Sequence, residues 1–302
     1  MDGVLVVDKP PGPTSHDIVE RVRRALGERK VGHTGTLDPF ATGVLPLCVG
    51  RATRLARFLG AGDKTYRATV RLGFATTTDD LTGEALSEPR RPVLTRAELD
   101  AALSRLVGSF DQVPPAFSAR RVGGRRMYEL ARRGESGPRA ATPVTVHSIE
   151  VLEADADRVS LEIRCTAGTY VRALARDLGE VLGTGGHLTA LRRTRSGPFG
   201  EESAVPGDDL ARAAERMIPL RALLVELPAV TVGARGRELV RHGRDLERDA
   251  VLDGFPERGV ERMRVLDESG DLLALAVPTG VADPGAAPLV RPRLHPEVVL
   301  LT

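Results

Sequence analysis

Hydrophobic and polar positions change period repeatedly along this chain, which predicts a mixture of short strands and helices. Residues 4–7 are an apolar run that ends at DKPPGP, a sequence with three prolines and a glycine that only a loop accommodates. Apolar positions then recur at helical spacing up to residue 26, with Thr14 or Ser15 as the cap and Gly27 as the stop. We expect the chain to begin as strand, loop and helix.

The clearest strand lies at residues 64–72, where apolar and polar side chains alternate as they do when one face is buried. Residues 145–152 and 159–165 predict further strands. Helices are predicted at residues 95–106, behind a capping box, and at 170–182. Strands and helices alternate too irregularly for a doubly wound fold, so the predicted class is α+β, with a mostly antiparallel mixed sheet flanked by helices.

The last part of the sequence has a different character. After prolines at 219 and 228, short strand-like segments at residues 229–232, 263–267 and 272–276 alternate with glycine and proline turns. This change predicts a large domain over residues 1–219 and a small β domain over residues 220–302.

Composition narrows the class of protein without naming it. The chain has 302 residues, 41% of them hydrophobic and 28% charged, and no run approaches the roughly 20 apolar residues of a membrane span. Its N-terminus lacks the basic region of a secretory signal, so we expect a cytoplasmic protein. Cys48 and Cys165 lie far apart, and the six histidines are scattered. These patterns predict no disulfide, no metal site and no cofactor.

The net charge of +2 conceals an uneven distribution of basic residues. Lys9, Lys30 and Lys64 are the only lysines among 43 basic residues. Seven arginines lie between residues 118 and 139, around a Gly-Gly pair, and predict a basic hairpin or loop that runs into a short helix at 127–131. A solvated charged face is the ordinary interpretation of such a run.

Residues 32–43, GHTGTLDPFATG, hold three glycines, a histidine and an Asp-Pro pair. This composition excludes a regular element and indicates a backbone shaped to present side chains, with Asp38 as the candidate. Local chemistry alone favours a plainer interpretation, in which Asp38 opens an Asx turn before Pro39 and His33 is a hydrogen-bonded loop residue.

Several separated segments together resemble the bacterial tRNA pseudouridine-55 synthase family, called the TruB family. They occur in that family's order and cover residues 2–200: VVDKPPGPTSHDIV, GHTGTLDPFATGVLPL, KTYRA at 64–68, PPAFSA at 114–119, GTYVR at 168–172 and LRR at 191–193.

The resemblance implies a pseudouridine synthase fold that isomerises uridine 55 in the T-arm loop of tRNA. The enzyme must break the C1′–N1 bond, rotate the uracil and rejoin it through C5, which requires a carboxylate in a pocket closed to water. By resemblance Asp38 is this nucleophile or base, Arg172 pairs with it, and Tyr66 stacks on the base and takes part in removing the C5 proton. Base addition, attack on the sugar and a glycal route all remain open.

The resemblance also implies substrate contacts. His33 fills the space that the flipped uridine leaves, Leu191 walls the pocket, and Tyr170 lies in a matched segment beside it. Lys9 and Lys64 support the cleft or face phosphates. Residues 118–139, including Arg120 and Arg121, clamp the T-arm through phosphate contacts, and residues 220–302 form a PUA-like RNA-binding domain.

Three other functions compete with this one. An RNA-folding chaperone would use the same basic cleft, either alone or alongside catalysis. A guide-RNA-dependent relative acting on ribosomal RNA shares the motif, but such relatives carry more sequence before the DKP segment. An Asp-nucleophile phosphatase is disfavoured because no second carboxylate lies two residues from Asp38. We expect a stand-alone monomer whose partner is the T-arm stem-loop, with no obligatory protein partner.

Overall fold

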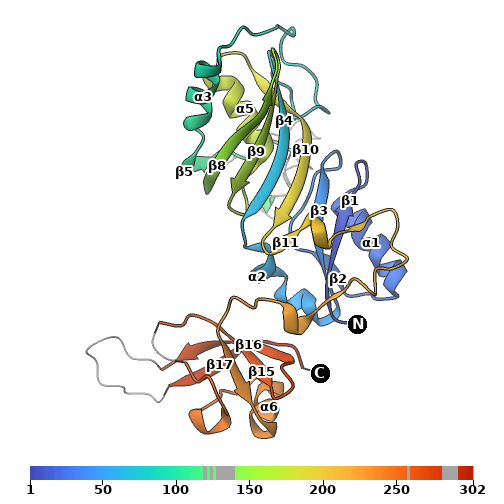
Figure 1. Ribbon diagram of the computed structural model, residues 1–302, viewed down its shortest axis with the longest axis vertical. Helices are drawn as coiled ribbons and strands as arrows, with labels where there is room; N and C mark the ends of the chain where they lie inside the picture. The colour runs from blue at the N-terminus through green and yellow to red at the C-terminus, as the bar shows by residue number, and fades with distance from the viewer. Residues whose placement is uncertain (118–120, 123–124, 127–139, 257–258, 281–291, 302) are drawn as a thin grey trace, which may run out of the picture.

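The computed structural model describes residues 1–301 apart from 118–120, 123–124, 127–139, 257–258 and 281–291. Within these residues it contains an eleven-stranded sheet, a four-stranded sheet and a two-stranded hairpin. Figure 1 shows an elongated molecule, with the large sheet above and the C-terminal sheet below. No helix of the described part is long and apolar enough to cross a membrane.

The large sheet is mostly antiparallel, as the sequence predicts. It comprises β1 (Gly3–Lys9), β2 (Val31–His33), β3 (Thr42–Val49), β4 (Lys64–Leu72), β5 (Gly108–Gln112), β8 (Thr142–Ala154), β9 (Arg158–Cys165), β10 (Gly186–Ser196), β11 (Phe199–Gly200), β12 (Val205–Pro206) and β13 (Ile218–Pro219). The main order is β12-β1-β3-β10-β4-β9-β8-β5, and among the described strands of this sheet only β1–β12 and β10–β3 pair in parallel. The α+β class is therefore confirmed.

Four α-helices accompany this sheet in the described residues: α1 (Ser15–Leu26), α2 (Ala56–Gly60), α3 (Arg96–Ser104) and α5 (Val171–Val181); a 3₁₀ helix, η1 (Gly50–Leu55), precedes α2. Thr14 caps α1, since its hydroxyl accepts from the Asp17 amide at 3.1 Å. The helix ends at Gly27 in the left-handed conformation, with φ of 61°. Thr14, and not Ser15, is therefore the cap, which leaves Ser15 available for another role.

The predicted alternation in β4 is confirmed. Every second side chain of this strand, from Lys64 to Leu72, is buried. The apolar ones join a core that α3 and α5 close from one side of the sheet, as Figure 1 shows. Tyr66 therefore faces inward among these side chains, on the strand that lies between β9 and β10.

The hydrophobic pattern did not predict β10, although this strand lies in the middle of the sheet between β3 and β4. Its central sequence, Leu-Arg-Arg-Thr-Arg, lacks an apolar period because the buried position is occupied by Arg193, which is 1% exposed. β5 was missed for a similar reason, since it carries three polar residues in five. The run 31–43 is less irregular than expected. Its first residues form β2 and its last residues begin β3, and these two strands pair with each other.

The basic hairpin predicted around residue 123 is described only in its backbone. β6 (Arg121–Val122) pairs with β7 (Arg125–Arg126) in antiparallel register. The helix expected at 127–131 lies outside the described residues, and so does Arg120.

The C-terminal sheet follows the order β14-β15-β16-β17. Its strands are β14 (Ala229–Val232), β15 (Met263–Asp267), β16 (Leu272–Thr279) and β17 (Arg293–Val299). The helix α6 (Ala234–Arg241) packs against this sheet, and the 3₁₀ helix η4 (Arg248–Ala250) follows α6. Two further 3₁₀ helices, η2 (Glu201–Ser203) and η3 (Leu220–Ala222), precede β14 in the chain. The first three strands were predicted. β17 was not, since no clear alternation marks it. The division of the chain after residue 219 stays a prediction.

One apolar cluster joins the two sheets. Val4 and Cys48 of the large sheet and Leu275 of β16 belong to it, and all three are fully buried. Arg51 donates to the carbonyl of Leu300 at 2.7 Å across the same contact. The small sheet is therefore packed directly against β1 and β3.

Candidate active site

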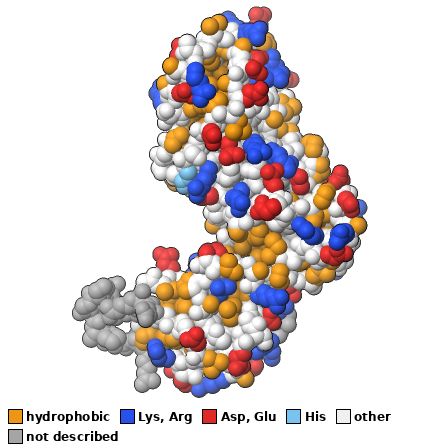
Figure 2. Space-filling model, in the orientation of Figure 1, with side chains coloured by type: hydrophobic (Ala, Val, Ile, Leu, Met, Phe, Trp, Pro, Cys, Tyr) orange, Lys and Arg blue, Asp and Glu red, His pale blue; other side chains and the backbone are white. Residues whose placement is uncertain are grey.

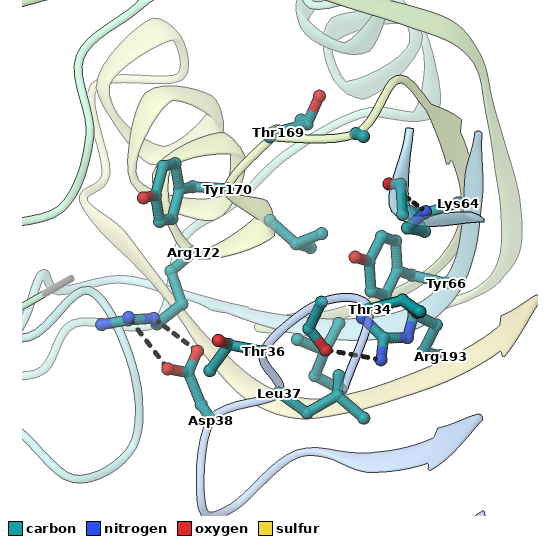
Figure 3. Close-up of a pocket in the computed structure, with 16 residues that line it drawn as sticks. Thr34, Thr36, Leu37, Asp38, Lys64, Tyr66, Thr169, Tyr170, Arg172 and Arg193 are labelled. Carbon is teal, nitrogen blue, oxygen red and sulfur yellow. Dashed lines mark hydrogen bonds and ion pairs between the residues drawn. The ribbon is translucent and has the colours of Figure 1, made fainter. Parts of the chain in front are cut away.

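A cavity of about 300 Å³ opens where β4, β10, the start of α5 and the loop of residues 34–41 meet (Figure 3). These segments are far apart in the sequence, and the fold brings them together. Most of the predicted site residues line the cavity: Asp38, Lys64, Tyr66, Tyr170, Arg172 and Leu191.

The loop that carries Asp38 is fixed from outside by side chains of other elements. The buried Ser15 hydroxyl donates to the Leu37 carbonyl at 3.0 Å and accepts from the Leu37 amide at 2.8 Å. The Gly12 amide donates to the Pro39 carbonyl at 2.8 Å. Because the loop lacks regular structure of its own, these contacts satisfy its backbone and hold Asp38 in one position.

Lys9 supports the same loop from behind. Its ammonium donates to the carbonyls of Pro10 and Pro39, each at 3.0 Å, and of Ala41 at 2.7 Å. The side chain is fully buried, and this burial lowers the pKa of Lys9 to about 8. All three donor positions of the ammonium are used, which favours the structural role over contact with phosphate.

Asp38 and Arg172 form a two-pronged ion pair at the cavity wall. Arg172 Nη2 donates to Asp38 Oδ1 at 3.1 Å, and Nε lies 3.0 Å from Oδ2, as the dashed lines in Figure 3 mark. The Arg172 side chain is 6% exposed, whereas that of Asp38 is 34% exposed. This geometry orients the carboxylate while leaving part of it open to the cavity.

The remaining donors of Arg172 are also occupied. Nη1 donates to the carbonyl of Thr78 at 3.0 Å and lies 3.4 Å from the carboxylate of Asp80, and Nη2 donates to the carbonyl of Phe117 at 2.7 Å. Asp80 is held in turn by the amide of Thr82 at 2.9 Å. The guanidinium is thus held between the carboxylates of Asp38 and Asp80 and two backbone carbonyls.

Burial raises the pKa of the Asp38 carboxyl, and the nearby charge of Asp80 adds to this effect. The Arg172 guanidinium opposes both through its charge and its hydrogen bond, and Lys9 assists it. Arg172 is therefore the main group that favours the ionised form of the Asp38 carboxylate.

Tyr66 lies across the cavity from Asp38 and Tyr170, on the inner face of β4 (Figure 3). Its ring is 8% exposed. Burial raises the pKa of the Tyr66 phenol, while the Arg193 guanidinium opposes that shift. A planar ring at the cavity wall offers a surface on which a base can stack.

The flanks of the cavity come from three other predicted residues. Lys64 donates to the carbonyls of Gly60 at 3.1 Å and Gly62 at 2.6 Å, and burial lowers its pKa to about 8. Leu191 is 8% exposed and supplies an apolar wall. Tyr170 caps α5, and Gln112 fixes its backbone through hydrogen bonds of 2.8 and 3.2 Å.

His33 lies at the end of β2, just before the loop, outside the set of residues that line the cavity. Its Nδ1 is buried and has no hydrogen-bond partner among the described residues. Burial lowers the pKa of His33, so the neutral ring is favoured. An unpaired ring nitrogen is available for a ligand that the protein alone does not provide.

Reasoning from the sequence missed Asp80, Ser15 and Arg193. Asp80 reads as a turn residue in TTTDDLTG, and its pairing with Arg172 arises only from the tertiary structure. Arg193 was noted as part of the matched segment LRR without a role, yet it lines the cavity. The signal that could have found it is its place at the centre of the arginine-rich segment LRRTR. In the fold this segment pairs with β4, and Arg193 lies opposite Tyr66.

Solved structures identify the fold. A Cbf5-Nop10-Gar1 complex superposes with a TM-score of 0.74 at 27% identity, covering 99% of this chain and 85% of that one. An H/ACA RNP bound to a substrate RNA containing 2′-deoxyuridine gives 0.72, also at 27% identity, with the same coverage of both chains. A model of the TruB family pseudouridylate synthase N-terminal domain matches residues 23–171. The fold is that of a pseudouridine synthase.

Curated relatives narrow this class further. The tRNA pseudouridine synthase B of Symbiobacterium thermophilum is 48% identical over 80% of this chain and 82% of that protein, and the Ralstonia pickettii enzyme is 45% identical over 91% and 90%. A model of the tRNA pseudouridylate synthase B C-terminal domain matches residues 172–227. This chain belongs to the TruB family, and it is a tRNA pseudouridine synthase.

Proposed function

We propose that this enzyme converts uridine 55 in the T-arm loop of tRNA to pseudouridine, with Asp38 as its nucleophile or base. The observation that carries this proposal is the Asp38–Arg172 pair, with its bonds of 3.0 and 3.1 Å, at the wall of a cavity that Tyr66 faces. The cavity volume of about 300 Å³ suits a single flipped nucleoside.

The chemistry divides into three steps. The C1′–N1 bond breaks with the help of the Asp38 carboxylate, whether through the sugar, the base or a glycal. The uracil then rotates, and a C1′–C5 bond forms. Finally the C5–H bond breaks, its electron pair closes the C5–C6 double bond, and N1 gains a proton. The proton gained at N1 replaces the one lost from C5, so the composition of the base is unchanged. Tyr66, as phenolate, accepts the C5 proton in this proposal.

Access to the buried carboxylate requires the target uridine to leave the stack, at a cost of a few kcal/mol. The unpaired Nδ1 of His33, beside the catalytic loop, supports a role in occupying the vacated space and bonding a neighbouring nucleotide. The enclosed cavity in turn holds the free uracil during rotation.

RNA binding outside the cavity is assigned to the segment of residues 118–139 and to residues 220–302 as a PUA-like domain. Arg121 belongs to the hairpin β6–β7, and Arg120 precedes it in the sequence. Both would bind phosphates of the T-arm stem. In this proposal one monomer acts on one stem-loop, in the cytoplasm and without an obligatory protein partner.

The test is tritium release from a tRNA transcript labelled at uridine C5. We expect the wild-type enzyme, acting alone, to release tritium. An Asp38→Asn variant should bind tRNA but release tritium more slowly, by on the order of 10⁴-fold or more. Asp208→Asn, at an exposed aspartate, is the matched control and keeps full activity. Cytidine in place of the target uridine abolishes release.

Two outcomes would overturn the proposal in different ways. Tight binding without release, together with restored folding of misfolded tRNA, would indicate a chaperone. Release that appears only after a guide RNA is added would indicate a guide-dependent enzyme, such as the H/ACA assemblies whose catalytic chain this fold resembles.

A further inference from the structure

Arg193 occupies the junction of three strands behind the cavity. On β10 it lies opposite Tyr66 of β4 on one side and pairs in parallel with Gly43 of β3 on the other. At 1% exposure it is the largest fully buried side chain of the described residues. A cation in this position requires a reason, because burial of an arginine is costly without compensating contacts.

The contacts of Arg193 differ from those of an ordinary buried ion pair. Its Nε donates to the carbonyl of Val44 at 2.7 Å, and Nη2 donates to the carbonyl of Gly35 in the catalytic loop at 3.1 Å. Its side chain lies opposite Tyr66 in the register of β10 and β4, and both residues line the cavity. Among the described residues no carboxylate lies within ion-pair distance of it. The charge therefore has no carboxylate partner there, and Figure 3 shows Arg193 near Tyr66.

We propose that Arg193, as a buried cation beside Tyr66, is a positioning residue that acts through Tyr66 and favours its phenolate form for removal of the C5 proton. The inference rests on the proposed function, in which Tyr66 accepts that proton. It extends this function by naming the group through which a buried tyrosine becomes a base.

Electrostatics supports this geometry. The titratable groups that act on Tyr66 are Arg193 on β10, Cys165 on β9 and Asp38 on the loop. Burial raises the pKa of Tyr66, and Cys165 and Asp38 raise it further, whereas Arg193 lowers it. Lys64 lines the same cavity, but Arg193, opposite Tyr66 on the neighbouring strand, is the cation that lowers the pKa of Tyr66. Arg193 is thus the cation placed to stabilise negative charge on the phenol oxygen.

The first experiment replaces Arg193 by glutamine and compares single-turnover rates on tRNA with uridine or 5-deuterouridine at the target. We expect unchanged tRNA affinity, a rate loss of about 10²-fold and an isotope effect larger than that of the wild type, because C5–H cleavage becomes limiting. The rate should recover at higher pH, since without the cation the pKa of Tyr66 rises. Arg195→Gln, at an exposed arginine of the same strand, is the control and changes neither quantity.

A substrate with 5-fluorouridine separates proton removal from loop positioning, because no C5 proton has to leave. Arg193→Gln should process it with a much smaller loss than it shows with uridine. Equal losses on both substrates, or a slower reaction without a larger isotope effect, would overturn the proposal and leave Arg193 as a structural residue of the loop.

A second variant keeps the test decisive if Arg193→Gln fails to fold. Arg193→Lys retains the charge but cannot bond two carbonyls with a planar fork, so we expect a smaller loss. In a double-mutant cycle with Tyr66→Phe, the lysine substitution should cost nothing further. Additive losses would refute coupling through Tyr66. Wild-type proton release by Tyr66→Phe alone would refute the assignment of Tyr66 as base, which is a separate result.

Discussion

At the scale of single residues, the site depends on two buried arginines with different surroundings. Arg172 lies between the carboxylates of Asp38 and Asp80, and its charge is compensated. Arg193 is bonded to backbone carbonyls instead. In the proposed mechanism the first arginine keeps a carboxylate ionised and the second acts on a phenol, so the neighbouring groups set the role of each cation.

The dependence of Asp38 on Arg172 predicts a shift in the pH profile. Burial already raises the pKa of Asp38, and loss of the opposing guanidinium in Arg172→Met raises it further. In the proposed mechanism Asp38 acts in its ionised form, so the acidic limb of the rate profile should move to higher pH. The maximal rate should also fall on the order of 10²-fold, since breaking a buried ion pair costs about 3 kcal/mol.

Single-turnover rates measured from weakly acidic to weakly alkaline pH check this expectation. Arg172→Lys is the matched variant, which keeps the charge and loses the two-pronged bond. It should show the smaller shift of the acidic limb. An unchanged limb in both variants would mean that Arg172 only supports the fold.

At the scale of elements, the catalytic loop is defined by what surrounds it. α1 contributes Ser15, β1 contributes Lys9, and β10 contributes Arg193, and each bonds the loop backbone. β3 then passes β10 so closely that a Cβ on Gly43 would lie 2.2 Å from the Arg193 carbonyl oxygen. The parallel contact between these strands therefore requires glycine at the end of the loop.

Two glycine substitutions test this close approach. Gly43 and Gly27 both have positive φ, of 99° and 61°, but Gly27 has open space around its Cβ position. Gly27→Ala should cost about 1–2 kcal/mol for the left-handed backbone alone. Gly43→Ala should cost more than about 3 kcal/mol, because backbone atoms must also separate. Urea unfolding of both variants measures the difference, and equal costs would contradict the close contact.

At the scale of the whole molecule, charge is largely balanced on the sheet's solvent face. Arg71 of β4 lies 3.3 Å from Asp157, and Arg164 of β9 lies 3.1 Å from Asp63. Figure 2 shows basic and acidic side chains interleaved over the visible surface. Paired arginines are poor sites for phosphate, so this face is a weak candidate for RNA contact despite its many arginines.

The shared apolar cluster predicts that the C-terminal sheet contributes to the stability of the large one. Leu275 is fully buried within that cluster, so Leu275→Ala should lower the free energy of unfolding by about 2–5 kcal/mol. The matched control, Leu86→Ala at a 65% exposed leucine, should change it by less than about 0.5 kcal/mol. Urea denaturation checks both. An unaffected midpoint in Leu275→Ala would mean that the two sheets unfold independently.

The sequence by itself determined the elements with a clean period and the residues of a continuous motif. β4, β9, α1 and α5 followed from alternation, helical spacing and end signals, which are local properties of the chain. Asp38, Tyr66 and Arg172 were found through the resemblance that their segments carry. Periodicity alone would have left Asp38 as the first residue of a turn.

Only the tertiary structure decided how these residues work together. The bond between Arg172 and Asp38 spans 134 positions, and the role of Asp80 depends on a contact with a helix 92 residues away. β10 was hidden because a charged residue, Arg193, occupies its buried position, stabilised by carbonyls that no local pattern reveals. Local sequence fixes backbone preferences, whereas the environment of a buried charge is supplied by distant segments, and for this reason the mechanism becomes visible only in the folded chain.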